Sequence, residues 1–174
     1  GGVGKTTLTQ VVFNSETIKN HFSKCIWVCI SNNFNVKDVI ISIVKNGDGS
    51  IRKEDEDQVE LVQRKLVELI ENKRYLLVLD DVWSEDELTW EPLQNILNRG
   101  ANGSRIVVTT RNNGVAHAMR SVHIQHLGLL PNDDCWSIFR NFVFEESNDG
   151  QEYEDLEEVG KQLVEKCGGL PLAL

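Results

Sequence analysis

The chain lacks several features that would place it in common protein classes. Its 174 residues contain no run approaching the roughly 18 to 20 apolar residues that cross a bilayer, and its first residues show no secretory signal pattern. Its four cysteines form no C-x-x-C pair, which argues against a zinc site or a disulfide framework. No internal repeat or low-complexity segment is present. These absences predict a globular protein of the reducing cytoplasm.

Positive charge is also scarce. Lysine and arginine number 18 against 27 acidic residues, for a formal net charge of −9. This balance argues against direct binding of nucleic acid, which needs clustered basic residues, whereas a nucleotide pocket needs only local positive potential. The acidic run at 54–57 directly precedes a helical pattern, so we interpret it as a solvated loop and first helical turn rather than as a partner-binding tail.

The chain begins with a pattern typical of phosphate-binding loops. Residues 1–7 read Gly-Gly-Val-Gly-Lys-Thr-Thr, the second half of G-x-x-x-x-G-K-[ST]. Backbone N–H groups of Gly2, Gly4 and Lys5 can line a nest around phosphate oxygens, because glycine has no Cβ to block the approach. We expect Lys5 to bind the β- and γ-phosphates and Thr6 to offer its hydroxyl to Mg²⁺. The helix that follows would add its positive dipole end.

An ordinary turn would also fit that short motif, but a second motif favours the phosphate-binding loop. Residues 75–83 read Tyr-Leu-Leu-Val-Leu-Asp-Asp-Val-Trp, as expected for a strand buried on both faces of a parallel sheet. Asp80 at its tip would hold Mg²⁺ directly or through water, and Asp81 would orient or deprotonate an attacking water. If the two acids only started a turn or capped a helix, the buried run and the upstream loop would be coincidences.

A third motif places an arginine at the same edge. Residues 106–111 read Ile-Val-Val-Thr-Thr-Arg, a further buried strand that ends in polar residues. Because parallel strands end at one edge of the sheet, Arg111 would lie near Asp80, within reach of phosphate. A surface arginine at a strand end is the competing interpretation.

Strands and helices alternate up to about residue 130, and only helices follow. Hydrophobic periodicity predicts helices at 6–14, 36–44 and 57–71, and strands at 25–30, 75–83, 106–111 and 123–127. From Pro131 onwards the apolar residues recur at helical spacing. The fold class is therefore α/β with a mostly parallel sheet, in two domains, 1–130 and 131–174.

Five motifs in order closely resemble one family. Besides the phosphate-binding loop and the acidic strand, they are residues 27–31, 103–111 and the Gly-Leu-Pro-Leu-Ala-Leu of 169–174. The chain resembles the NB-ARC domain of plant disease-resistance proteins, and Trp83 resembles their coiled-coil branch rather than the Toll-receptor-like branch. The resemblance implies a P-loop NTPase with its first strand missing, followed by part of the helical ARC1 subdomain. That strand would be central, so its neighbours should expose apolar surface.

The resemblance also implies roles for individual residues. Asp80 and Thr6 would hold the metal, Asp81 would be the base and Arg111 the γ-phosphate sensor. Pro171 would contact adenine, although it also suits the start of a helix. The nucleotide would be bound by the loop residues Gly1, Gly2, Val3, Gly4, Lys5, Thr6 and Thr7.

The function implied is a switch that rests with ADP, exchanges it for ATP after pathogen perception, and signals by rearranging its domains and self-associating. ADP or ATP with Mg²⁺ would be the cofactors, and any hydrolysis would be slow. The coiled-coil and leucine-rich-repeat domains of the same protein would be its partners. A turnover ATPase, such as a motor or remodelling enzyme, remains the alternative, because both classes use these motifs. A small GTPase is less favoured, because the chain has no Asn-Lys-x-Asp motif.

Overall fold

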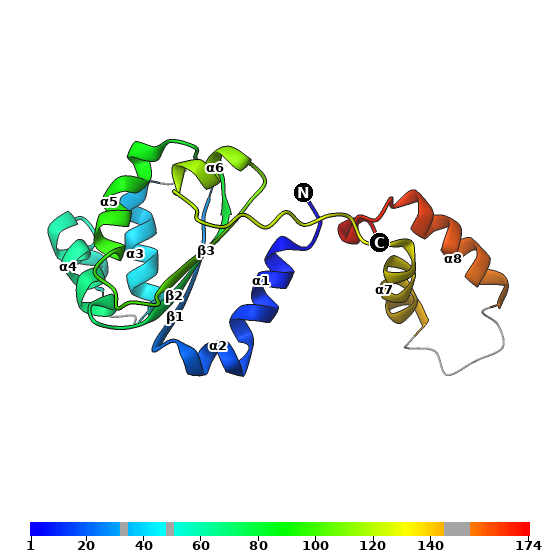
Figure 1. Cartoon of the computed structure of the whole chain (residues 1–174), viewed down its shortest axis with the longest axis horizontal. Helices are drawn as coiled ribbons and strands as arrows, with labels where there is room; N and C mark the ends of the chain where they lie inside the picture. The colour runs from blue at the N-terminus through cyan, green and yellow to red at the C-terminus, as the bar shows by residue number, and fades with distance from the viewer. Residues whose placement is uncertain (32–34, 48–50, 145–153) are drawn as a thin grey trace. The chain divides into compact units, whose positions relative to one another are not determined.

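A parallel sheet of three strands forms the centre of residues 6–124 (Figure 1). The computed structural model describes residues 1–31, 35–47, 51–144 and 154–174. The strands are β1 (Lys24–Cys29), β2 (Tyr75–Val82) and β3 (Arg105–Thr110), in the order β1-β2-β3. Because all three run in the same direction, their carboxyl ends lie at one edge of the sheet. β2 is central, which explains its continuous apolar sequence.

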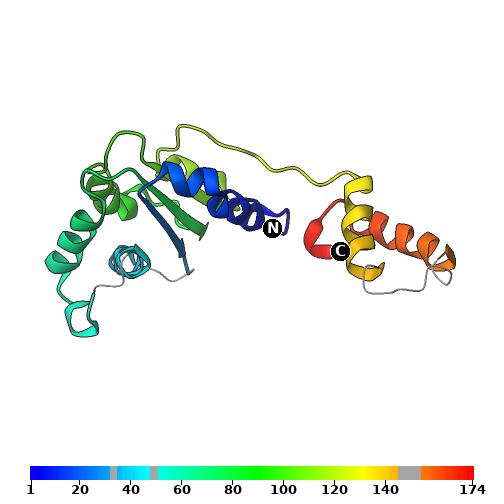
Figure 2. The same ribbon diagram turned by 90° about the horizontal axis from the view of Figure 1, so that it is seen from below.

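Helices cover both faces of this sheet (Figures 1 and 2). On one face pack α3 (Val36–Gly47), α4 (Val59–Ile70) and α5 (Glu87–Leu97), and on the other lie α1 (Lys5–Asn14) and α2 (Glu16–His21). Side chains of β2 alternate between the two faces of the sheet, since successive residues of a strand point to opposite faces. Leu77 and Leu79 join the large core with α3, α4 and α5, whereas Leu76 and Val78 pack with Phe22, which follows α2.

Short polar side chains define where several helices begin. Ser15, Asp86 and Asn112 stand before α2, α5 and α6 (Asn113–Ala118), and each accepts a hydrogen bond from a backbone N–H of the first turn. A single 3₁₀ turn, η1 (Lys53–Asp55), precedes α4. The acidic residues at 54–57 therefore lie before a helix, as the sequence predicts.

Residues 1–5 and 125–174 form the second compact unit. Its helices α7 (Asn132–Phe144) and α8 (Glu154–Lys166) pack together, and the 3₁₀ turn η2 (Pro171–Ala173) follows. Gly160 allows the close approach of α8, because an added Cβ would lie 2.9 Å from the Trp136 ring and 3.0 Å from that of Phe139. In the same unit, the N–H of Leu172 donates a hydrogen bond to the carbonyl of Gly2 over 3.2 Å. The predicted domain boundary near residue 130 stays a prediction.

The strand predicted at 123–127 is wrong. These residues are irregular, and all but Leu127 are exposed. A strand needs a hydrogen-bonding neighbour, and within the described ranges none lies beside this segment. β3 is instead an edge of the sheet, with Ile106 40% and Val107 37% exposed. Helices α2, α5 and α6 were not anticipated from periodicity.

Candidate functional site

Two glycines shape the loop before α1. Gly2 has φ +81° and Gly4 has φ +91°, in the left-handed region that glycine adopts without strain. A Cβ added to Gly2 would lie 2.9 Å from Cβ of Leu172, whereas one added to Gly4 would meet no described atom within 4 Å. Gly2 is therefore needed for packing, and Gly4 leaves open space beside the loop. The loop continues directly into the N-terminus of α1, which begins at Lys5 and suits an anion.

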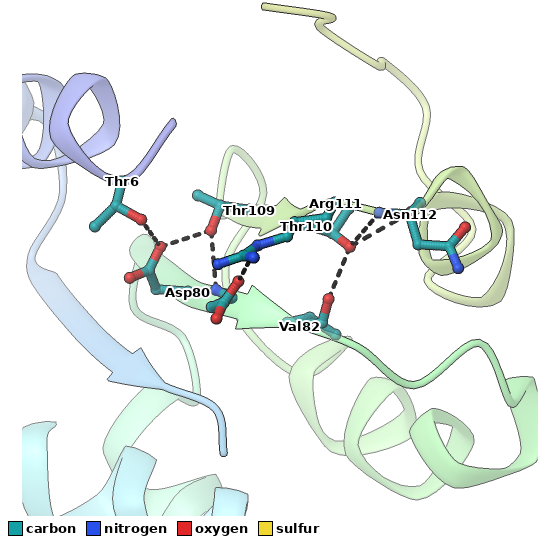
Figure 3. A network of polar contacts seen from close by, with 8 residues as sticks. Thr6, Asp80, Val82, Thr109, Thr110, Arg111 and Asn112 are labelled. Atoms are coloured by element: carbon teal, nitrogen blue, oxygen red, sulfur yellow. Dashed lines mark hydrogen bonds and ion pairs between the residues drawn. The ribbon is translucent and has the colours of Figure 1, made fainter. Parts of the chain in front are cut away.

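Thr6 and Asp80 meet at the carboxyl edge of the sheet (Figure 3). The Thr6 hydroxyl donates a hydrogen bond to Oδ1 of Asp80 over 2.9 Å. Asp80 is only 6% exposed, and its backbone carbonyl accepts a hydrogen bond from the N–H of Ile30 over 2.9 Å. The structure thus joins the start of α1 to the ends of β1 and β2.

The oxygen atoms at this edge fit Mg²⁺. A hydroxyl and a carboxylate are hard donors, and Mg²⁺ is usually bound through one or two carboxylates, water and the phosphates of its nucleotide. Among the described residues, no group of three or more His, Cys, Asp or Glu side chains could hold a metal ion. The hydroxyl of Thr6 and the carboxylate of Asp80 suit a Mg²⁺ ion that arrives with the phosphates of a nucleotide.

Asp81 lies in a bulge between β2 and β3. Leu79 pairs with Val108 and Val82 pairs with Thr110, so Asp80 and Asp81 together face the single residue Thr109. Asp81 has φ +57°, a left-handed conformation that few residues other than glycine adopt. Bulges redirect side chains, and the extra residue separates the directions of the two carboxylates.

Arg111 lies between Asp81 and an aromatic ring. Its Nε is 3.6 Å from Oδ1 of Asp81, and its Cζ lies 5.1 Å from the centroid of the Trp83 ring. About half of the Arg111 side chain is exposed. The guanidinium is therefore held near the edge of the sheet and remains accessible to an anion.

The loop after β3 is anchored by the next threonine. The Thr110 hydroxyl donates to the carbonyl of Val82 over 2.7 Å and accepts the N–H of Asn112 over 3.0 Å (Figure 3). Since Arg111 lies between these residues in sequence, the two hydrogen bonds limit the backbone movement of the arginine.

The structure brings together four of the predicted site residues, which are Thr6, Asp80, Asp81 and Arg111. The N-terminal glycines and Pro171 belong to the other unit, where Leu172, next to Pro171, hydrogen-bonds to Gly2. Sequence reasoning assigned no site role to Thr109 or to Trp83. A signal for Thr109 was its place in the polar pair Thr109-Thr110 that ends a predicted strand just before Arg111. No local pattern indicated that Trp83 contacts the arginine.

Comparison with known proteins identifies the family. A profile described as the NB-ARC domain matches residues 1–149. The chain belongs to the NB-ARC family. This NB-ARC domain is a P-loop NTPase domain, and the match confirms the predicted fold class and a nucleotide-binding role.

The chain is similar in sequence to proteins from plants. The NB-ARC domain is 42% identical over 176 residues to "Disease resistance protein RGA2" of Solanum bulbocastanum, a match that covers 99% of the chain and 18% of that protein. It is 40% identical over 178 residues to "Disease resistance RPP13-like protein 4" of Arabidopsis thaliana, which covers 100% of the chain and 20% of the relative. The chain thus spans about a fifth of the length of these relatives. In the described ranges, no helix has the length and hydropathy of a membrane span.

Proposed function

We propose that this NB-ARC domain is the ADP/ATP switch of a plant immune receptor of the coiled-coil branch. The observation that carries the proposal is the ion pair between Arg111, the proposed γ-phosphate sensor, and Asp81, the proposed base. In the structure these two side chains pair with each other. A bound γ-phosphate would compete with Asp81 for the guanidinium, so the arrangement differs between the ADP and ATP states.

This competition costs little free energy. Both side chains are about half exposed, and ion pairs of that kind contribute at most about 1 kcal/mol. A phosphate that accepts two hydrogen bonds from arginine offers a stronger, charge-assisted interaction. To move the populations of two conformational states from 1:99 to 99:1, a nucleotide must bind one state roughly 10⁴-fold more tightly than the other. Arg111 and Lys5 would supply a part of this difference in affinity.

We assign the other roles from the sequence motifs. The loop of residues 1–7 would bind the phosphates, with Lys5 as the main charge, and Pro171 would pack on adenine. Thr6 and Asp80 would hold Mg²⁺, which when bound neutralises phosphate charge. Asp81 would orient or deprotonate the attacking water, and we expect any hydrolysis to be slow. A slow ATPase suits a switch better than a motor.

The wider context is part of the same proposal. In the full-length protein, coiled-coil and leucine-rich-repeat domains would hold the resting state, and ATP binding would release them and allow self-association. The relatives are named disease resistance proteins, which supports a role in plant defence. We propose that the protein acts in the cytoplasm.

The test measures the nucleotide released when the purified full-length protein is denatured, together with its steady-state ATP turnover. Near-stoichiometric ADP with slow turnover is expected of the switch. An empty site with sustained turnover would reject the switch and favour a working ATPase. Lys5→Arg should lose bound ADP and signalling, whereas Lys19→Arg, at an exposed lysine of α2, should retain both.

A further inference from the structure

Thr109 occupies a special place at the carboxyl edge of the sheet. It is the single residue of β3 that faces the two acids of the bulge, and it is only 6% exposed. Its hydroxyl donates a hydrogen bond to Oδ1 of Asp80 over 2.6 Å and accepts the backbone N–H of Asp81 over 2.9 Å (Figure 3). One hydroxyl therefore contacts both acids of the motif, the first through its side chain and the second through its backbone.

The Asp80 carboxylate is held from two sides. Thr6 donates to Oδ1 from α1, and Thr109 donates to the same oxygen from β3. Hydrogen bonds from hydroxyls to a carboxylate are charge-assisted and short, and together these two restrict rotation about the bond that carries the carboxylate. Oδ2 takes part in neither bond, so this oxygen is directed away from the two hydroxyls.

The second hydrogen bond supports the bulge. At a bulge the regular pairing of backbone groups is interrupted, and a buried N–H that loses its partner is costly. Here the Thr109 side chain accepts the N–H of Asp81. This bond stabilises the left-handed conformation of Asp81, which in turn places its carboxylate beside Arg111.

We propose that Thr109 is a positioning residue for the divalent cation of this site. Its hydroxyl orients the Asp80 carboxylate, so that Oδ2 can accept a hydrogen bond from metal-bound water or contact the metal, and it also fixes the bulge that carries Asp81. The inference rests on the proposed function, because it requires that the nucleotide binds together with Mg²⁺. It adds β3 to the elements that build the metal site.

Thr109→Val is the decisive variant. Valine keeps the β-branched shape of threonine and removes both hydrogen bonds. ADP affinity of the full-length protein is measured in EDTA and in Mg²⁺, and the ratio of the two gives the gain due to the metal. We expect the affinity in EDTA to stay near wild type and the gain to fall about tenfold, the lower end of what loss of a metal-orienting partner costs.

Two further variants separate positioning from folding. Thr109→Ser keeps the hydroxyl and should restore the gain due to Mg²⁺. Thr89→Val removes a hydroxyl that donates to Asp86 and not to Asp80, and should leave the gain unchanged.

Each result has a distinct meaning. An unchanged Mg²⁺ gain in Thr109→Val would overturn the proposal, and so would an equal loss of ADP affinity with and without metal, which indicates a structural role only. If the wild-type protein bound no ADP, or bound it without any gain from Mg²⁺, the proposed function would fail and the role of Thr109 would fail with it.

Discussion

The hydroxyl of Thr6 donates a hydrogen bond to the carboxylate of Asp80, 74 residues further along the chain. This bond joins the first turn of α1, which follows the phosphate-binding loop directly, to the end of the central strand β2. A movement of the first turn of α1 would therefore alter the hydrogen bonding of Asp80, the side chain proposed to hold the metal.

Replacement of Asp80 by asparagine should uncouple nucleotide from metal. The amide oxygen can still accept hydrogen bonds from the two threonines, but the negative charge that attracts Mg²⁺ is lost. We expect ADP affinity in EDTA to be retained and the gain from Mg²⁺ to fall by about tenfold or more. Titration of the protein with ADP, in EDTA and in Mg²⁺, measures the affinity and the gain due to the metal. Asp134→Asn, at an exposed acid of α7, should behave as wild type, and an Asp80→Asn protein with a full gain would exclude Asp80 as a metal ligand.

Replacement of Arg111 by alanine should reduce the preference for ATP over ADP. The guanidinium is accessible, so a charge-assisted contact to the γ-phosphate should be worth about 1.5 kcal/mol, which corresponds to about tenfold in affinity. Competition between the two nucleotides measures the change. Arg105→Ala serves as the control, because Arg105 is exposed at the opposite end of the same strand. An unchanged ATP-to-ADP ratio would mean that Arg111 does not sense the γ-phosphate.

Replacement of Trp83 by alanine should resemble a mild form of the Arg111 variant. The ring lies 5.1 Å from Cζ of Arg111, and cation–π contacts at exposed sites contribute about 0.5–1 kcal/mol. We therefore expect a smaller loss of ATP preference, and Trp83→Phe should retain most of it because an aromatic face remains. If the alanine and phenylalanine variants lose equal amounts, the ring does not act through the arginine.

Alanine at Gly2 should destabilise the protein more than alanine at Gly4. Both positions have positive φ, where a Cβ costs about 1–2 kcal/mol. Only at Gly2 does the new Cβ also collide with another side chain, that of Leu172. Urea unfolding without nucleotide should give the larger loss of unfolding free energy for Gly2→Ala. Gly128→Ala, where a Cβ meets no described atom within 4 Å, should have little effect, and equal losses at Gly2 and Gly4 would contradict the packing against Leu172.

Tyr75 should make stability sensitive to alkaline pH. Its hydroxyl donates to the Leu97 carbonyl over 2.9 Å, and burial raises its pKa from 10.0 to about 12. Below pH 10 the phenol is neutral in both states, so its contribution is complete. From pH 10 to 12 only the unfolded state loses the proton, so the free energy of unfolding falls.

The variant Tyr75→Phe removes both the hydrogen bond and the titrating group. It should cost about 1 kcal/mol at pH 7, where the bond is lost, and should weaken the decline in stability above pH 10. Unfolding by urea at a series of pH values measures both effects. A decline as steep as that of the wild type would show that other groups are responsible.

Much of the fold follows from local patterns. The apolar run of 75–79 predicts a strand buried on both faces, and β2 is the central strand. Hydrophobic residues at helical spacing predict α3 and α4, and the buried residues of α4 lie on one side of that helix. The strand at 123–127 was wrong because pairing depends on a neighbouring strand, which no local pattern reports.

The sequence by itself determined which chemical groups stand at the carboxyl edge. Asp80 and Asp81 lie near the end of β2, and Arg111 directly follows β3. Parallel strands bring such ends together whatever the details of packing. The tertiary structure alone decided how these groups are oriented. The bulge at Asp81, the double hydrogen bond of Thr109 and the contact of Arg111 with Trp83 depend on the register between β2 and β3. That register is set by packing of residues far apart in sequence, so no local pattern contains it.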